Sequence, residues 1–212
     1  MNNKIENVKN AFKYNYFPDI KNIDRTKIQI TTEGIYSISD NESTKKLIYL
    51  LLKYFKTNNI IITDATGNNG ADTIALAHEF KKINSIELNE TNFKALENNV
   101  KKVYNLNNVN LFNNDSLKMF KQLKQDVIYI DAPWGGINYK KNERIELYMN
   151  KKNIGEIFNE FKSEAKLFIF KVPKNYDFTN FIQITMVTKY YLYLYKKNDK
   201  PKFFLLFVPT VE

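Results

Sequence analysis

The chain has 212 residues and a formal net charge of +9, and it contains one His and no Cys. The absence of Cys excludes disulfides, thiolate zinc sites and thiol nucleophiles. A single His argues against His-based metal sites and Ser–His–Asp triads, so we expect no metal. The chemistry must therefore rely on carboxylates, backbone groups and a reactive group supplied by a cofactor.

The excess of positive charge suggests a polyanionic partner, for which RNA or DNA is the usual candidate. An alternative stays open, because Lys, Asn, Ile, Tyr and Phe are all over-used, as in products of AT-rich genomes. No apolar run approaches the length of a membrane span, and the N-terminus, 1-MNNKIENVKN-10, lacks the apolar core of a signal peptide. We therefore expect an intracellular, soluble protein of the cytoplasm or nucleus that does not contact a membrane. We also expect a monomer.

The chain divides into an irregular, aromatic-rich lead, residues 1–42 with at most one short helix, and a regular core, residues 43–212. Strands and helices alternate in this core, which predicts a parallel sheet covered on both faces, and a closing hairpin adds an antiparallel edge. The expected elements are a helix at 43–57, a strand at 59–63, a helix at 71–80, a strand at 83–88, a helix capped by Thr91, a strand at 109–113, a short helix at 116–124, a strand at 126–130, a helix at 153–163, a strand at 166–172, and strands at 182–195 and 202–208 joined by a turn at 197–201.

The loop after the first strand contains closely spaced glycines. It is 64-DATGNNGADT-73, with Gly67 and Gly70 just before a helix. Glycines at such a place allow a tight turn and let backbone N–H groups approach a ligand closely. The loop has neither the G-x-G-x-x-G pattern of dinucleotide sites nor a P-loop lysine, which disfavours NAD and ATP.

Polar residues also follow the next two strands. Glu87 ends the second strand, where a carboxylate can take both hydroxyls of a ribose, and Asn114 and Asp115 follow the third, where they suit an adenine amino group. Taken singly, each could be a solvated cap. Together they predict an adenosine site, and S-adenosylmethionine fits best because it carries its own electrophile.

The fourth strand runs into 128-IYIDAPWGG-136, which holds the only Trp of the chain. An exocyclic base amine needs its lone pair freed from the ring before it can attack a methyl group. Asp131 and the carbonyls around Ala132–Pro133 could hold the two N–H groups, and Trp134 could stack on the base. The alternative is that Trp134 is a core aromatic and Gly135–Gly136 an ordinary turn.

At these residues the sequence resembles the trimethylguanosine synthase family, whose members methylate N2 of the 7-methylguanosine cap of RNA. The resemblance covers nearly the whole chain, and it implies a class I (Rossmann-like) α/β fold with a seven-stranded, mostly parallel sheet, a terminal antiparallel hairpin and a short N-terminal helical extension that contributes to the substrate site. The matching segments are 13-KY-14, 34-GIYSIS-39, 64-DATGNNGADT-73, 86-IELNE-90, 95-ALENN-99, 114-ND-115, 131-DAPWGGINY-139 and 169-IFKVPKN-175.

The resemblance also implies roles for single residues. Trp134 would stack on 7-methylguanine with Ser37 near the other face, and Lys13, Tyr139 and Lys174 would hold the cap phosphates of the RNA. The implied catalytic residues are Asp131, Pro133 and Trp134. The implied cofactor residues are Asp64, Gly67, Gly70, Thr73, Glu87, Asn114 and Asp115, with Ser39 near the amino-acid end of S-adenosylmethionine.

The sequence departs from the family pattern in four places. Ala132 replaces the first Pro of the loop, Asn68 replaces a Gly, Asp40–Asn41 replaces Pro-Glu, and Lys174 replaces an Arg, which loses the bidentate fork for phosphate. Two other functions stay open. One is an adenine-N6 methyltransferase of DNA or RNA, which shares the Asp-Pro-Trp type of loop. The other is an RNA-binding module with a decayed cofactor site, which Asn68 and Ala132 would favour.

Overall fold

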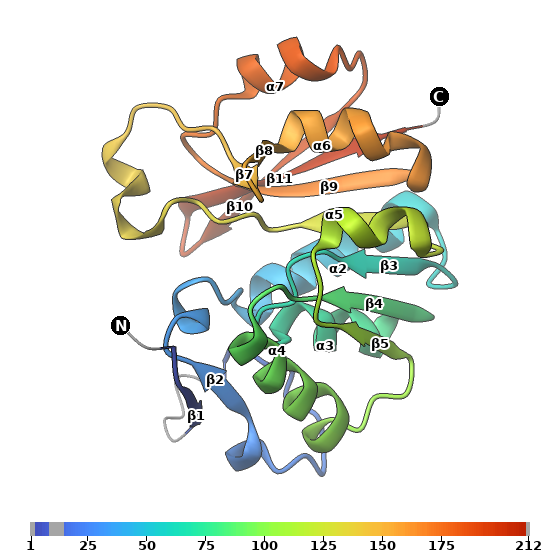
Figure 1. Ribbon diagram of the computed structural model, residues 1–212, viewed down its shortest axis with the longest axis vertical. Coiled ribbons are helices and arrows are strands. Elements are labelled where there is room, and N and C mark those ends of the chain that lie inside the picture. Colours follow the sequence, from blue (N-terminus) through green and yellow to red (C-terminus); the bar gives the residue numbers. More distant parts are fainter. Residues whose placement is uncertain (1–2, 9–14, 211–212) are drawn as a thin grey trace. The chain divides into compact units, whose positions relative to one another are not determined.

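The computed structural model describes residues 3–8 and 15–210, and the chain forms two compact units, Met1–Met119 and Phe120–Glu212 (Figure 1). Both units combine helices with strands, which pair in parallel in the first unit and mostly antiparallel in the second. In the described part of the chain, no helix has both the length and the apolar character that a membrane span requires.

The first unit contains three parallel strands in the order β3 (Ile61–Asp64), β4 (Lys82–Ile86) and β5 (Val109–Phe112). These strands confirm the expected ones to within a few residues. Ile62 lies opposite Ile83, and both side chains are fully buried, as expected of a sheet covered on both faces. The polar residues that follow β3, β4 and β5 therefore leave the sheet at the same edge.

Helices α2 (Asn41–Phe55), α3 (Ala71–Glu79) and α4 (Glu90–Glu97) also belong to the first unit, and α4 continues as a π-helix over Asn98–Val103. Asp40 caps α2 by accepting a hydrogen bond from the Ser43 N–H at 3.0 Å. The prediction that Thr91 caps α4 is wrong. Asn89 is the cap, and its side chain accepts from the N–H groups of Thr91 and Asn92.

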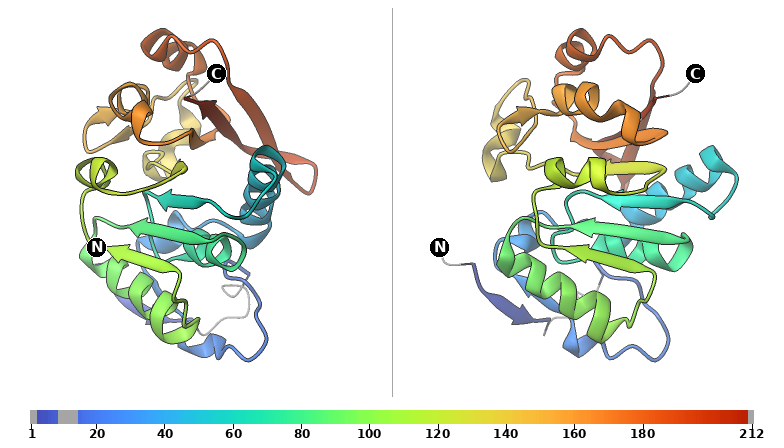
Figure 2. Two further views of the ribbon diagram at one scale, coloured as in Figure 1. Left: turned by 90° about the vertical axis from the view of Figure 1, so that its right-hand side faces the viewer. Right: turned by 45° about the vertical axis from the view of Figure 1, so that its right-hand side comes forward.

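The lead is joined to the first unit by side-chain amides. It forms a small antiparallel pair of β1 (Ile5–Asn7) and β2 (Gln29–Thr31), and β2 lies beside α4 (Figures 1 and 2). The buried amide of Asn99 accepts from the Gln29 N–H at 2.7 Å and donates to the Gln29 carbonyl at 2.6 Å. It thereby replaces the neighbouring strand that β2 lacks on that side, and the lead becomes part of the unit that carries the glycine loop.

The second unit contains four strands in the order β10 (Tyr191–Lys197), β11 (Lys200–Pro209), β9 (Leu167–Pro173) and β6 (Val127–Ile130). β6 and β9 are parallel, whereas β11 runs antiparallel to both β9 and β10. Asn198 and Asp199 form the turn of the hairpin with positive φ angles, as the turn at 197–201 predicts. Helix α6 (Ile154–Phe161) packs against α7 (Phe178–Thr185).

Two expectations for this part of the chain are wrong. Residues 182–190 do not belong to a strand, because 182–185 end α7, which Asp177 caps through the Asn180 N–H at 3.0 Å, and β10 begins only at Tyr191. The expected helix at 116–124 is split into α5 (Ser116–Met119) and a 3₁₀ turn at Phe120–Gln122. The short hairpin of β7 (Tyr148–Met149) and β8 (Lys152–Asn153) was not predicted from the sequence.

Candidate active site

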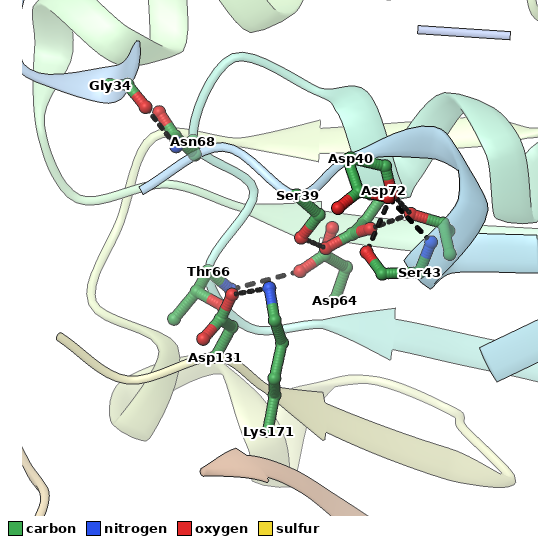
Figure 3. A network of polar contacts seen from close by, with 11 residues as sticks. Gly34, Ser39, Asp40, Ser43, Asp64, Thr66, Asn68, Asp72, Asp131 and Lys171 are labelled. Carbon is green, nitrogen blue, oxygen red and sulfur yellow. Dashed lines mark hydrogen bonds and ion pairs between the residues drawn. The ribbon is translucent and has the colours of Figure 1, made fainter. Parts of the chain in front are cut away.

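The two ends of the glycine loop are tied together by a buried acid. Asp64 accepts a hydrogen bond from the Thr73 hydroxyl at 2.6 Å. It also accepts one from the Thr66 N–H at 3.2 Å, which Figure 3 shows. The Thr73 hydroxyl also lies 2.7 Å from that of Ser85 on β4. Asp64 and Thr73 are almost completely buried, so in this structure they support the shape of the loop. Their contact with the cofactor remains a prediction.

Gly67 and Gly70 are glycines for two different reasons. A Cβ on Gly67 would lie 2.5 Å from the Ser85 hydroxyl and 3.0 Å from a methyl of Leu96, so the loop passes too close to β4 and α4 for a side chain. Gly70 has a φ of 90°, in a region that glycine enters without strain. Both positions hold the loop in its bent form at the end of β3.

Asn68 fits the place where the family has Gly. Its φ is 48°, in the left-handed region that Asn tolerates better than most residues. Its backbone N–H donates to Glu87 at 2.8 Å, and its side chain donates to the Gly34 carbonyl at 3.0 Å (Figure 3). A Cβ on Gly34 would lie 2.4 Å from the side-chain oxygen of Asn68. Asn68 in place of Gly therefore keeps the left-handed backbone conformation of the loop and adds a hydrogen bond to Gly34 in the lead.

Glu87 is held by two backbone amides at the end of β4. One carboxylate oxygen accepts from the Asn68 N–H at 2.8 Å and the other from the Asn89 N–H at 2.8 Å. Burial raises the pKa of Glu87 above its ordinary value of 4.5, although these hydrogen bonds oppose the shift. The Asn92 side chain and the Leu88 N–H also stabilise its charged form. The carboxylate is therefore oriented by its neighbours, and its contact with two ribose hydroxyls remains a prediction.

This arrangement gives a pH-dependent prediction. Only the ionised carboxylate accepts both hydroxyls, so affinity for S-adenosylhomocysteine should fall as the pH drops through the raised pKa of Glu87. Glu87→Gln should weaken binding about tenfold at pH 7, the loss expected for hydrogen bonds to a charged group, and should flatten the pH dependence. Calorimetric titrations between pH 5 and 8 would check this. An unchanged dissociation constant in Glu87→Gln would contradict the assignment.

The remaining predicted cofactor residues also lie in the first unit. Ser39 is buried and donates to Asp72, in the first turn of α3, at 2.5 Å, and Thr44 donates to the same carboxylate (Figure 3). Asn114 accepts from the Asp115 N–H at 2.8 Å, and Asp115 accepts from the Leu117 N–H at 2.9 Å. Both thus shape the turn after β5, and contact with adenine remains a prediction.

Two of the predicted substrate residues belong to the lead. Ser37 is exposed at the end of a 3₁₀ turn, and Lys13 lies outside the described residues.

In the second unit, Asp131 is paired with a lysine that sequence reasoning missed. Ile130 on β6 lies opposite Phe170 on β9, so the following residues, Asp131 and Lys171, are neighbours. The Lys171 ammonium lies 2.6 Å from a carboxylate oxygen of Asp131 (Figure 3), and Lys171 is only 7% exposed. A lysine inside the fully buried strand 167-LFIFKVP-173 is the signal that could have found this pair, because a buried charge requires a partner.

Trp134 packs in an aromatic cluster beside this ion pair. Its ring lies edge to face with Tyr139 at 5.3 Å and is tilted against Phe203 at 6.3 Å. The Lys171 ammonium lies 5.9 Å from the indole centroid. The indole is only partly buried, yet its N–H is buried and has no hydrogen-bond partner among the described residues. An unpaired buried donor is costly, and a ligand could satisfy it.

The loop after Trp134 is shaped by its backbone. Gly135 and Gly136 have φ angles of 89° and 70°, and a Cβ on either would meet nothing within 4 Å. Conformation alone therefore favours glycine here. Asn175 then holds the following 3₁₀ segment, because its side chain donates to the carbonyls of Tyr139 at 2.9 Å and Asn142 at 2.8 Å. The sequence did not single out Asn175, which thus fixes a predicted phosphate residue, while neighbouring Lys174 is exposed.

Each of the two units holds groups that suit a step of methyl transfer. The first holds a glycine loop and an oriented carboxylate that suit the ribose of S-adenosylmethionine, which supplies an electrophilic methyl group when bound. The second holds an acceptor carboxylate and a partly exposed indole that suit a base. Among residues 3–8 and 15–210 there is no group of three or more His, Cys, Asp or Glu side chains placed to bind a metal ion.

Similarity to known proteins agrees with this chemistry. The chain is 29% identical to the uncharacterized protein L320 of Acanthamoeba polyphaga mimivirus, over 78% of this chain and 74% of that protein. It superposes on the magnesium protoporphyrin IX methyltransferase of Synechocystis PCC 6803, solved with bound S-adenosylmethionine, with a TM-score of 0.58 at 14% identity over 93% and 89% of the two chains. A protein of Porphyromonas gingivalis W83 assigned as a methyltransferase gives a TM-score of 0.60 at 18% identity over 84% of this chain, which spans 42% of its length.

These similarities confirm the predicted fold class. The chain has the class I methyltransferase fold, with a seven-stranded, mostly parallel sheet and a terminal antiparallel hairpin. It is an S-adenosylmethionine-dependent methyltransferase. The profile of one family, the RNA cap guanine-N2 methyltransferases, matches residues 59–210, which include both the glycine loop and the Trp134 loop. The chain belongs to this family of cap methyltransferases.

Proposed function

We propose that this enzyme transfers a methyl group from S-adenosylmethionine to the exocyclic N2 of 7-methylguanosine at the 5′ cap of RNA. The product would be a di- or trimethylguanosine cap. Membership of the cap guanine-N2 family supports the proposal. The observation that carries it is the partly exposed indole of Trp134, held in a rigid aromatic cluster with a buried, unpaired N–H.

The acceptor amine has to be held before it can react. The lone pair of N2 is delocalised into the guanine ring, so hydrogen bonds that favour a tetrahedral nitrogen promote attack on the methyl group. In this proposal the Asp131 carboxylate accepts one N–H and a backbone carbonyl near Pro133 accepts the other. Lys171 donates to one oxygen of this carboxylate at 2.6 Å, which orients it before substrate arrives.

The preference for a methylated guanine follows from charge. Methylation at N7 makes the purine cationic, and stacking on an indole then gains a cation–π interaction that neutral guanine lacks. Lys171 already lies near this indole, but its charge is balanced by Asp131. The indole therefore faces a neutral pair, and it retains its attraction for a cationic base.

Replacement of Trp134 tests this proposal. A desolvated cation–π contact is worth about 2 kcal/mol, a factor of roughly thirty in affinity. Wild-type protein should bind m7GTP about that much more tightly than GTP, Trp134→Ala should lose the difference, and Trp134→Phe should keep part of it. Because Trp134→Ala has no fluorescent Trp, calorimetry is the suitable measurement. Added salt should lower the affinity for m7GTP and for GTP by the same factor, because it screens the phosphate contacts with Lys13 and Lys174.

The same titrations separate the alternative functions. Equal affinity of the wild-type protein for m7GTP and GTP would contradict the cap proposal. Methyl transfer to an adenine-containing oligonucleotide would then favour the adenine-N6 methyltransferase. Failure to bind S-adenosylhomocysteine would favour the decayed RNA-binding module.

A further inference from the structure

A cavity adjoins the Trp134 loop, and apart from Pro133 and Trp134 its lining residues have no predicted role. It lies within the second unit and has a volume of about 370 Å³. The residues that line it include Trp134 and Gly135 from the Trp134 loop and Asn142, Arg144, Glu146 and Tyr148 from the segment that follows. Its volume falls within the range of roughly 300–1,000 Å³ that is usual for small-molecule sites.

Arg144 is the cation of this cavity. The chain uses Arg only at positions 25 and 144. Arg25 is paired with Asp19 at 3.2 Å and donates to the Phe17 carbonyl at 3.3 Å. Arg144 is exposed and makes no hydrogen bond or ion pair with any residue that the structure describes. A planar guanidinium that lines a cavity with its donors unused is suited to a phosphate.

The backbone at Arg144 is anchored to the end of β9. The Ile145 N–H donates to the Asn175 carbonyl at 2.8 Å, and the Asp177 N–H donates to the Ile145 carbonyl at 2.9 Å. Arg144 is therefore fixed beside the segment that begins with Lys174, an exposed lysine that also lacks a partner among the described residues. Two unpaired cations on adjoining segments indicate an anion that extends along this surface.

Tyr148, which also lines the cavity, offers a platform for a base. Tyr148 is 48% exposed, and its hydroxyl donates to Glu146 at 2.6 Å. The same carboxylate oxygen accepts from the Asn153 amide at 2.9 Å, so Glu146 and the ring of Tyr148 are both held in place. A fixed, exposed ring is a stacking surface for an unpaired base. The other Glu146 oxygen can accept a hydrogen bond from a base amine and repels phosphate toward Arg144.

We propose that this cavity binds the first nucleotide after the cap, with its base against Tyr148 and the phosphate on its 3′ side paired with Arg144. The proposal rests on the cap function, because the cavity shares Trp134 with the site assigned to 7-methylguanine. RNA attached to a cap on Trp134 would then continue into the neighbouring cavity, so the enzyme gains affinity from the transcript as well as from the cap.

Arg144→Ala tests the proposal, with Lys141→Ala as the matched control. Lys141 is exposed, lies three residues away, carries the same charge and does not line the cavity. The ligands are m7GTP and m7GpppApG, and quenching of the single Trp reports binding. Arg144→Ala should lower the affinity for m7GpppApG about tenfold, which is the loss expected for a charge-assisted hydrogen bond near the surface. The affinity for m7GTP should stay nearly unchanged. Lys141→Ala should change neither affinity markedly. Tyr148→Ala, like Arg144→Ala, should lower only the affinity for m7GpppApG.

Three results would overturn the cavity assignment. They are equal weakening of both ligands by Arg144→Ala, no weakening of either, and the same weakening by Lys141→Ala. A failed cap function has a different signature. If wild-type protein binds m7GTP no better than GTP, yet GpppApG binds in an Arg144-dependent way, the cap proposal fails and the nucleotide cavity stands.

Discussion

Asp131→Ala is expected to lower the turnover number about a hundredfold, the usual cost of removing one preorganised polar group from a reacting centre. Asp131 follows β6 in the second unit, whereas the residues predicted to bind the cofactor belong to the first. Affinity for S-adenosylhomocysteine should therefore stay unchanged. Tritium transfer from S-adenosylmethionine to m7GTP measures turnover, and calorimetry measures cofactor binding.

The pairing of Asp131 with Lys171 requires a control for this experiment. Removal of the carboxylate leaves a buried ammonium without its 2.6 Å partner, which destabilises the fold as well as the reaction. The double variant Asp131→Ala/Lys171→Met removes both charges, so it should regain stability but not turnover. Near-normal turnover in either variant would show that Asp131 does not act on the amine.

Lys171→Met should have the largest effect on stability. Breaking a buried ion pair by removing one partner costs about 3–5 kcal/mol, because the remaining charge stays buried without compensation. The Lys171 and Asp131 side chains are only 8% and 16% exposed, so solvent can do little to replace the lost partner. Urea denaturation followed by circular dichroism would give the difference in unfolding free energy.

Lys166→Met is a matched control for that measurement. Lys166 pairs with Asp126 at 2.9 Å close to the start of β9, but its side chain is 64% exposed. Exposed pairs contribute only about 0–1 kcal/mol, so Lys166→Met should change stability little. Similar small losses in Lys166→Met and Lys171→Met would mean that the Asp131–Lys171 pair is not important for stability.

The sequence predicted most of the strands of the sheet and the polar residues at their ends. The strands from β3 to β6 have strong β-branched or apolar patterns, and their parallel direction follows from alternation with helices. The strand predicted at 182–195 is wrong over residues 182–190, and one reason is that Ile182, Ile184 and Thr185 are β-branched like residues of a strand. The cap at Asp177 and a left-handed Met186 enclose them in a helix instead.

The candidate site was less predictable, because several of its residues act through tertiary contacts. Lys171 meets Asp131 only through the register of β6 on β9, and a single sequence does not specify register. Asn175 and Arg144 depend on how a loop folds back on the end of β9. The glycine loop and the Trp134 loop were recognisable because their residue types are unusual within a short stretch.

The outer strand of the terminal hairpin has a consequence for handling the protein. β10 is the last strand in the order of the second unit, and its segment 191-YLYLY-195 is the type of sequence that joins other chains into intermolecular sheets. Lys196 and Lys197 follow it directly, and the pairing with β11 shifts between Tyr195 and Lys196. The positive charges of these lysines repel those of another copy, and the register shift interrupts the edge of the strand, so both oppose aggregation. Concentrated salt shortens the reach of that repulsion to about 3 Å at 1 M, so solubility should depend on ionic strength.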